Sequence, residues 1–284
     1  MTTHDVAVGG TTLRVREWGD AAGRPLVYWH GLNPFGALEL NEAGPAWAAR
    51  GFRIVAPAAP GCGDSPSLAD PGDYRPTRLA ELVVALADEL GLDRFAYVGW
   101  SWGASIGVHL AVRRPERLTA LALLDAGHTD VDDGKSLEER TAELELQQAG
   151  FRFPGWDAFL ELAREQRAAA WRPAVEERLR AGMREAGDAV VARSDPRAAA
   201  AALHGLTLEP PRSTLDALGR LELPILLVLA SGNDTAAATG RFRAAVPHAE
   251  IRTIESGHDL LGEAPEETIA LVGDWLETTS AALE

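Results

Sequence analysis

The sequence predicts an α/β fold: a mostly parallel, twisted sheet of about eight strands flanked by helices, with an all-helical cap inserted after the sixth strand. Two observations carry this prediction. Short apolar runs rich in β-branched residues alternate with helical patterns along most of the chain, which is typical of parallel strands joined by crossover helices. This alternation stops near Asp130, where signals for helices take over, and it resumes at Leu221.

Several runs are expected to form the central strands, because each is short, apolar and bounded by turn-forming residues. These runs are Leu26–Trp29, Phe52–Ala56, Phe95–Gly99, Leu118–Leu124, Ile225–Ala230 and Glu250–Ile254. Val6–Val8 and Leu13–Glu17, joined through Gly9-Gly10, are expected to form a hairpin at the edge of the sheet. Helices such as Thr77–Leu90, which is apolar along one face, then cover the sheet on both sides.

The interruption defines two predicted units, an α/β core over residues 1–129 and 211–284 and a cap over residues 130–210. Signals for helix starts recur through the cap. Ser136-Leu-Glu-Glu139 matches a capping box, Asp157 is expected to cap the next helix, and Asp195-Pro196 supplies a cap followed by a first-turn proline. Because parallel sheets place their sites at the carboxyl ends of the strands, we expect the cap to cover that edge.

The net charge excludes two classes of partner. The 284 residues include 42 acidic and 27 basic side chains, which gives a formal charge of −15 at pH 7. Nucleic-acid binding needs a surplus of Lys and Arg on one face, and an anionic membrane surface repels a protein of this charge. We therefore expect a small-molecule substrate, no nucleic-acid or membrane partner, and a monomer or homodimer.

The chain shows no signal for export or membrane insertion. Its single cysteine, Cys62, cannot form an intrachain disulfide. His4 and Asp5 occupy the region where a signal peptide has its basic and apolar segments. No apolar run approaches the roughly 20 residues of a membrane span. The expected location is cytoplasmic.

The most informative stretch is Gly99-Trp-Ser-Trp-Gly103, which follows an apolar strand and precedes a helix. A G-x-S-x-G pattern in this context places the serine on a sharp, strained turn, and the small flanking residues let strand and helix approach closely. The helix that starts at Trp102 points its free amides toward whatever Ser101 attacks. Ser101 is therefore predicted to be a nucleophile.

A nucleophilic serine needs a base, and the base needs an acid that orients it. His258 is the predicted base, because it follows the last strand and the glycine beside it lets the loop turn the imidazole toward the sheet edge. Two carboxylates follow strand ends between the serine and this histidine. Asp234, after the strand Ile225–Ala230, is preferred, and Asp125, after the preceding strand, is the alternative.

Acyl transfer also needs hydrogen-bond donors for the oxyanion. The amide of Trp102 is one, and the loop His30-Gly-Leu-Asn-Pro34 is expected to supply the amide of Leu32 as the second. The walls of the substrate pocket are predicted to include Trp29, Asn33, Trp100 and His128. Tryptophan walls suit an uncharged acyl or aromatic group.

These motifs resemble the α/β-hydrolase superfamily in its lid-bearing serine esterase and lactonase-like branch. The resemblance spans essentially the whole chain, in the order His30-Gly31, Pro60-Gly-Cys-Gly-Asp-Ser65, Gly99-Trp-Ser-Trp-Gly103, Asp234 and Gly257-His258. It implies a triad of Ser101, Asp234 and His258, an oxyanion hole made by the amides of Leu32 and Trp102, and no cofactor. Two positions depart from the family pattern: Ser231 stands where a glycine is usual, and Cys62, which we interpret as a packed thiol, stands where an aromatic or aliphatic residue is common.

Related chemistries of this fold fit the sequence less well. Haloalkane dehalogenases and epoxide hydrolases use a carboxylate nucleophile, whereas position 101 is a serine. Epoxide hydrolases also donate hydrogen bonds from cap tyrosines, and Tyr28, Tyr74 and Tyr97 all lie outside the predicted cap. No metal site is expected, because Asp130-Val-Asp-Asp-Gly134 lacks the spacing of a calcium loop.

The sequence thus predicts a serine hydrolase that cleaves a small, uncharged carboxylic ester, lactone or thioester through an acyl-enzyme. Two alternatives stay open. The same fold and residues also suit cofactor-free perhydrolysis, C–C bond hydrolysis or amide cleavage. A ligand-sensing protein with little turnover is the second alternative, although an intact triad argues against it.

Overall fold

An eight-stranded sheet runs through the computed structural model, which describes residues 1–131, 133–233 and 235–282. The strand order is β1-β2-β4-β3-β5-β6-β10-β11. All neighbours from β4 to β11 pair in parallel, whereas β1, β2 and β4 pair in antiparallel fashion. The strands are β1 (Thr2–Val8), β2 (Thr11–Trp18), β3 (Arg24–Trp29), β4 (Phe52–Pro57), β5 (Phe95–Trp100), β6 (Leu118–Leu124), β10 (Ile225–Ala230) and β11 (Glu250–Ile254). The predicted fold class, central strands and edge hairpin are confirmed.

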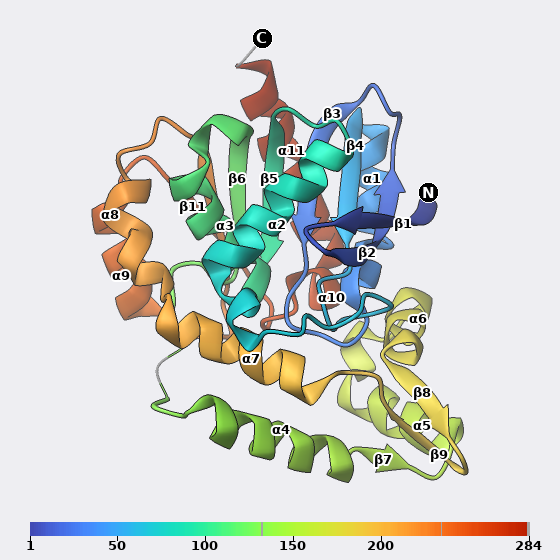
Figure 1. Cartoon of the computed structure of the whole chain (residues 1–284). Coiled ribbons are helices and arrows are strands. Elements are labelled where there is room, and N and C mark those ends of the chain that lie inside the picture. The colour runs from blue at the N-terminus through green and yellow to red at the C-terminus, as the bar shows by residue number, and fades with distance from the viewer. Residues whose placement is uncertain (132, 234, 283–284) are drawn as a thin grey trace.

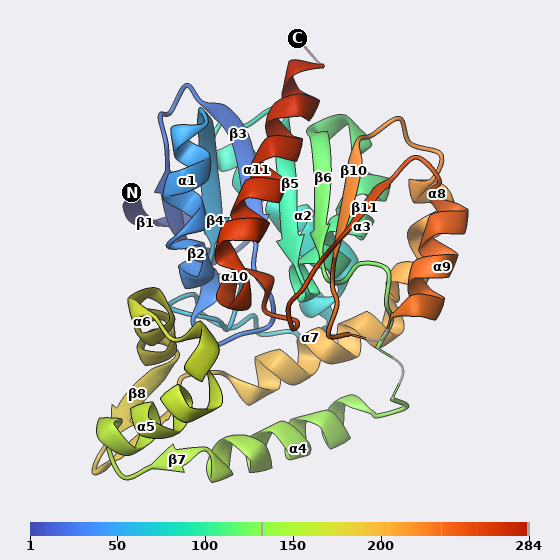
Figure 2. The ribbon, with the colours of Figure 1, turned by 180° about the vertical axis from the view of Figure 1, so that it is seen from behind.

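Helices cover both faces of this sheet, as Figures 1 and 2 show from opposite sides. They are α1 (Ala43–Ala49), α2 (Pro76–Glu89), α3 (Trp102–Arg113), α8 (Leu215–Leu218), α9 (Ala236–Ala245), α10 (Leu260–Glu263) and α11 (Pro265–Ala281). Side chains alternate between the two faces along each strand. In β3, Val27 and Trp29 join the apolar layer with α2 and α3, while Leu26 and Tyr28 join the layer with α1 and α11. The sheet is therefore buried on both sides.

Most of the chain between β6 and β10 forms a cap below the sheet in the view of Figure 1, whereas α8 lies beside the sheet. It contains α4 (Leu137–Gly150), α5 (Trp156–Gln166), α6 (Pro173–Ala181) and α7 (Pro196–Leu208), and α4 lies along α7. The predicted boundaries at residues 130 and 210 fall in the connections before α4 and after α7.

The cap is not all-helical, so that part of the prediction is wrong. It also holds an antiparallel sheet of order β7-β9-β8, formed by Arg152–Phe153, Ala189–Ala192 and Met183–Ala186. Gly187, at φ 66°, turns the β8–β9 hairpin, and the β-branched Val190 packs in a small apolar cluster with Phe159 of α5. The hairpin was not predicted because it is short and the sequence on both sides of it has a helical pattern.

Two of the three predicted helix caps in the cap domain are present, and one is not. The capping box of Ser136 and Glu139 is present, and the Asp195 carboxylate accepts hydrogen bonds from the amides at the start of α7. Asp157 does not cap α5. The chain enters that helix through Gly155 at φ 113°, so the helix begins at Trp156 and Asp157 lies in its first turn.

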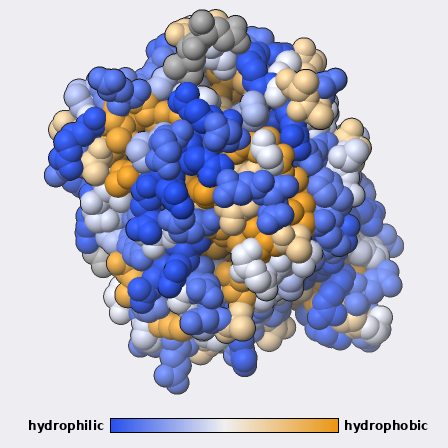
Figure 3. Space-filling view, turned by 45° about the horizontal axis from the view of Figure 1, so that its top comes forward, coloured by the Kyte–Doolittle hydropathy of each residue, from blue (hydrophilic) through white to orange (hydrophobic). Residues whose placement is uncertain are grey.

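The surface agrees with the polar composition. In the space-filling view of Figure 3, hydrophilic residues cover most of the visible face, and apolar residues show mainly in gaps between them. Within the described ranges, no helix combines the length and the apolar character needed to cross a membrane.

Two arginines at the α6 end of the cap dock it onto the core. Arg172 forms a bidentate ion pair with Glu42 and donates to the carbonyl oxygens of Leu261 and Gly262. Arg178 of α6, whose side chain is only 4% exposed, donates to both carboxylate oxygens of Asp259, at 3.2 and 2.5 Å. These contacts join α6 to the loop and short helix that follow β11. The cap is therefore fixed to the core at its α6 end.

We expect Arg178→Met to lower the free energy of unfolding by about 3 kcal/mol, because removing one partner of a buried ion pair leaves an uncompensated charge. The double variant R178M/D259N should recover much of that loss, since it removes both charges. Arg197→Met, which breaks a pair with Glu145 at an arginine that is 78% exposed, should leave stability nearly unchanged. Urea denaturation measures the free energy of unfolding of all three variants. Equal losses of stability in the Arg178 and Arg197 variants would contradict the role of the buried ion pair in docking the cap.

Candidate active site

Ser101 occupies the sharp turn between β5 and α3. Its backbone has φ 53° and ψ −114°, an unusual conformation for a residue with a side chain. The two flanking glycines leave no room for a larger residue: a Cβ on Gly99 would lie 2.4 Å from the carbonyl oxygen of Gly103, and a Cβ on Gly103 would lie 2.1 Å from that of Trp29. Close packing between strand and helix therefore forces the strained turn that presents the Ser101 hydroxyl.

His258 connects this serine to a carboxylate. Its Nε2 lies 2.8 Å from the Ser101 Oγ, and its Nδ1 lies 2.7 Å from Asp125 Oδ2. A carboxylate accepts hydrogen bonds, so Nδ1 carries the proton and Nε2 is free to accept the serine hydrogen. The His258 side chain is 46% exposed, whereas that of Asp125 is fully buried. The three residues thus form a chain that runs from solvent into the core.

Asp125 is held rigidly at the end of β6. Its amide donates to Val228 of β10 at 2.7 Å, and its Oδ1 accepts from the amide of Ala230 at 2.8 Å. Its Oδ2 also accepts from Nδ2 of Asn233. With His258, these donors satisfy a carboxylate that would be costly to bury unpaired. Like Ser101, Asp125 has a positive φ, of 52°, which turns its side chain back toward the neighbouring strand ends.

The histidine therefore bonds to the acid that the sequence analysis kept as the alternative. Asp234, the preferred acid, lies outside the described residues. Sheet order explains how Asp125 reaches the site, because β6 lies between β5, which ends at the serine turn, and β10. The Ser101 amide donates to Leu124 at 3.0 Å, so the serine and the acid leave neighbouring strand ends together.

The loop after β3 lies beside the start of α3. Gly103, which approaches Trp29, also lies close to His30. A Cβ on Gly103 would lie 3.0 Å from the His30 carbonyl oxygen. The amides of Leu32 and Trp102, the two predicted oxyanion donors, have no acceptor among the described residues. Both N–H groups are therefore available as donors to a ligand.

His30 fixes the path of this loop. Its Nε2 accepts from the amide of Ala59 at 2.8 Å, so its proton is on Nδ1, which donates to the carbonyl oxygen of Gly31 at 2.5 Å. Burial lowers the pKa of His30 to about 4. The imidazole is therefore neutral and bridges the loops that follow β3 and β4.

The residues predicted to line the pocket have different environments. Trp100 packs its ring 5.5 Å from that of His258 and donates its indole hydrogen to the His258 carbonyl oxygen at 2.8 Å. Trp29 is fully buried and meets Trp102 edge to face. His128 is also buried, against Phe242, and its ring nitrogens have no partner among the described residues. Burial lowers the pKa of His128. Trp29 therefore packs in the core, and His128 is buried.

A cavity of about 370 Å³ lies between the core and the cap and begins at the proposed oxyanion loop. The loop side is formed by Leu32, Asn33 and Pro34 and by Pro60–Cys62, and the cap side by residues of α4 and α7 such as Leu144, Ala198 and Leu203. Cys62 is packed, as expected, and burial raises the pKa of its thiol to about 12. None of the described lining residues is basic.

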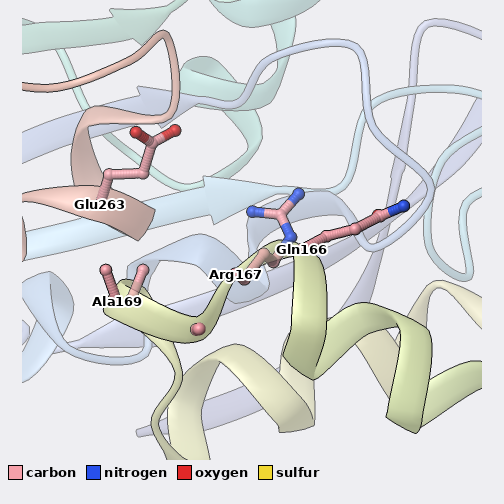
Figure 4. A pocket seen from close by; sticks show the side chains of 6 residues that line it. Gln166, Arg167, Ala169 and Glu263 are labelled. Carbon is pink, nitrogen blue, oxygen red and sulfur yellow. The ribbon is translucent and has the colours of Figure 1, made fainter.

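A second hollow, of about 410 Å³, lies on the histidine side of the site. Figure 4 shows Glu263, from α10, on one side of it and Gln166 and Arg167, from the end of α5, on the other. Glu263 also accepts a hydrogen bond from the amide of Gly257 at 2.9 Å. The loop that carries His258 is thus held next to this hollow.

Sequence reasoning missed several polar side chains that support the site. Asn233 bonds to Asp125, Asp259 joins the histidine loop to Arg178 of the cap, and Glu39 lies buried beneath the oxyanion loop. A signal existed for Asn233 and Asp259 alone, since each adjoins a residue already singled out.

Comparisons with known proteins agree with this fold. A family model described as "alpha/beta hydrolase fold" matches residues 24–265. An epoxide hydrolase from Caballeronia sordidicola is 32% identical over 118 residues, which cover 42% of this chain and 35% of that protein. A putative non-heme haloperoxidase from Mycobacterium phage D29 is 33% identical over 123 residues, 43% of each chain. The chain thus matches less than half the length of these relatives.

A solved structure matches nearly the whole chain. The thioesterase domain from the curacin biosynthetic pathway superposes with a TM-score of 0.76, covering 96% of this chain and 98% of that one at 18% identity. A likeness at this identity shows the fold alone.

We expect Gly103→Ala to abolish the reactivity of Ser101, because its Cβ would meet the Trp29 carbonyl oxygen at 2.1 Å and displace either the serine turn or the end of β3. Gly240→Ala is the matched control, since it also lies in a helix but has open space around it. That change should raise stability by up to about 1 kcal/mol and leave reactivity unchanged. Thermal unfolding measures the stability of both variants, and a serine-directed label measures the reactivity of Ser101. A fully reactive Gly103→Ala protein would contradict the close approach of Gly103 to Trp29.

Proposed function

Because the chain belongs to the α/β-hydrolase fold family, we propose that it is a serine hydrolase that cleaves a small, uncharged carboxylic ester, lactone or thioester. The superfamily inferred from the sequence is confirmed by the family model and by the fold. The observation that carries the proposal is the hydrogen-bonded chain from Ser101 through His258 to Asp125. A serine, a histidine and a buried acid joined in this order form the arrangement that activates a hydroxyl nucleophile.

The proposed reaction has two steps. As the Ser101 Oγ attacks the acyl carbon, its proton passes to His258 Nε2, and the amides of Leu32 and Trp102 bind the oxyanion. His258 then protonates the leaving alcohol, so the C–O bond breaks and an acyl-enzyme forms. A water molecule gives a proton to His258 and hydrolyses the acyl-enzyme, and the proton returns to Ser101. The buried Asp125 carboxylate stabilises the imidazolium in both steps.

We assign the acid to Asp125 rather than to the sequence-preferred Asp234. The assignment is supported by the 2.7 Å contact with His258 Nδ1 and by the further donors that hold the carboxylate in place. An acid so constrained keeps the imidazole in the tautomer that accepts the serine proton.

The cavity beside the oxyanion loop supports an uncharged substrate. Its lining is rich in leucine, proline and alanine, and the only ionisable carboxylate among its described lining residues, Asp195, already accepts hydrogen bonds from the amides of Arg197 and Ala198. A cavity of about 370 Å³ accommodates a small acyl or alcohol group. An anionic substrate would find no basic side chain along the described lining.

Epoxide opening is less well supported, although an epoxide hydrolase is among the relatives. Position 101 offers a hydroxyl rather than a carboxylate. The tyrosines also lie away from the cap: Tyr28, Tyr74 and Tyr97 are buried in the core, and their hydroxyls bond to Glu39, to the Leu68 amide and to the Gly103 carbonyl.

Treatment with a fluorophosphonate should label Ser101 alone, and mass spectrometry of the digested protein locates the adduct. Ser101→Ala should remove both the label and ester hydrolysis. Ser105→Ala, at a buried serine one turn along the same helix, should change neither. A wild-type protein without a label on Ser101 would contradict the serine-hydrolase proposal. If Ser101 is labelled, assays with a panel of esters, thioesters, amides and peracid-forming reactions rank the substrates.

Asp125→Asn should lower kcat for an aryl ester by about 10⁴-fold, because an amide in place of the carboxylate favours the wrong histidine tautomer. Asp234→Asn is the comparison, and we expect it to have a far smaller effect. Steady-state kinetics on both variants decide between the two carboxylates. The opposite ranking would return the role to Asp234.

A further inference from the structure

A buried acid outside the catalytic chain lies beneath the oxyanion loop. Glu39, in the short helical turn Gly36–Leu40, is only 5% exposed. One of its carboxylate oxygens accepts from the Tyr28 hydroxyl, and the other accepts from Asn33 Nδ2 at 3.2 Å. Burial raises the pKa of Glu39 well above its ordinary value. A carboxyl group in such a place is costly, and an apolar residue of the same size would fill the space.

Asn33 connects Glu39 to the peptide that carries the Leu32 amide. One hydrogen of its Nδ2 goes to Glu39, and the other goes to the carbonyl oxygen of Gly31 at 3.1 Å. The Oδ1 of Asn33 accepts from the amide of Phe35 at 3.0 Å, which fixes the orientation of the side-chain amide. Every polar atom of the Asn33 side chain is therefore engaged.

The Gly31 carbonyl and the Leu32 N–H belong to the same planar, trans peptide group and point in opposite directions. Asn33 Nδ2 and His30 Nδ1 both donate to that carbonyl oxygen. Holding the oxygen on one side of the loop aims the N–H to the other side. Donation to the carbonyl also polarises the peptide and makes its N–H a stronger donor.

We propose that Glu39 is a positioning residue for the oxyanion hole: it holds Asn33, which holds the Gly31–Leu32 peptide so that the Leu32 N–H faces the substrate. Tyr28, fully buried in β3, fixes Glu39 to the central sheet in turn. The chain of contacts thus runs from a rigid strand to the donor of the oxyanion. The inference rests on the proposed function, since only acyl transfer to Ser101 gives the Leu32 N–H an oxyanion to bind.

The decisive variants change what Glu39 can accept while keeping its size. Glu39→Leu fills the same space but cannot hold Asn33. The double variant Y28F/E39L removes the tyrosine hydroxyl that would otherwise lose its partner, so it tests the same contact with less cost to folding. Glu39→Gln is the conservative variant, because its amide oxygen can still accept from Asn33 while its amide nitrogen donates to the Tyr28 oxygen.

For an aryl ester, we expect both leucine variants to lower kcat by about 10-fold or more with little change in KM, since the donor acts on the oxyanion rather than on the bound ester. Their second-order rate constants for fluorophosphonate labelling of Ser101 should fall in parallel. Glu39→Gln should stay close to wild type in both measurements. Thr214→Val, which removes a buried hydrogen bond to the Pro211 carbonyl oxygen just before α8, should lower the melting temperature without changing kcat.

The inference would be overturned if the leucine variants kept the wild-type kcat and labelling rate, or if their effect were confined to KM. It would also be overturned if Glu39→Gln were as impaired as Glu39→Leu. If the leucine variants fail to fold, Asn33→Asp takes their place: it keeps the acceptor for Phe35 but loses both donated hydrogens, and an unchanged kcat would overturn the inference. Failure of wild-type Ser101 to label at all would instead contradict the proposed function, and the inference with it.

Discussion

The contact between the first turn of α3 and the end of β3 is the constraint on which the site depends. Gly103 approaches the Trp29 carbonyl so closely that no side chain fits between them. This approach forces Ser101 into its strained conformation, and it also brings the Trp102 amide next to the loop that carries the Leu32 amide. One packing requirement therefore sets the turn of the proposed nucleophile and brings together the two segments that carry the proposed oxyanion donors. The polar contacts of His30 and Asn33 then fix orientations within a frame that backbone packing has already determined.

Sequence patterns were sufficient to locate the candidate residues whose placement follows from local structure. The Ser101 turn is defined by glycines two residues away, and the glycine beside His258 lies in the same short loop. The acid is different, because Asp125 and Asp234 both follow strands and a pattern does not show which carboxylate turns inward. Asp125 does so through a positive φ and through hydrogen bonds to β10. Aspartate tolerates that conformation without any neighbouring signal, so the structure was needed to find the contact with His258.

The remaining misses have a common physical origin in contacts between distant segments. Arg178 and Asp259 are 81 positions apart, and neither charge is distinguishable in the sequence from those that lie on the surface. Nothing in the run Gly36-Ala-Leu-Glu-Leu40 distinguishes Glu39 from an exposed acid until the fold buries it beneath Asn33 and beside Tyr28. The cap hairpin was missed because β8 and β9 are only four residues each and a local helical pattern surrounds them. Long-range pairing decides all of these cases, and it leaves little trace in local composition.

The cap contacts divide its influence on the site into two parts. Arg178 bonds to Asp259, the residue after His258, and its guanidinium also lies 5.0 Å from the ring centre of Phe35, two residues beyond Asn33. The α6 end of the cap therefore contacts the histidine loop and the oxyanion loop at once. The α4 and α7 end contributes the apolar wall of the 370 Å³ cavity and has no such contact with the histidine loop among the described residues. We therefore expect changes near α6 to alter the geometry of the proposed catalytic residues, and changes on α4 and α7 to alter the shape of the group that fits in the cavity.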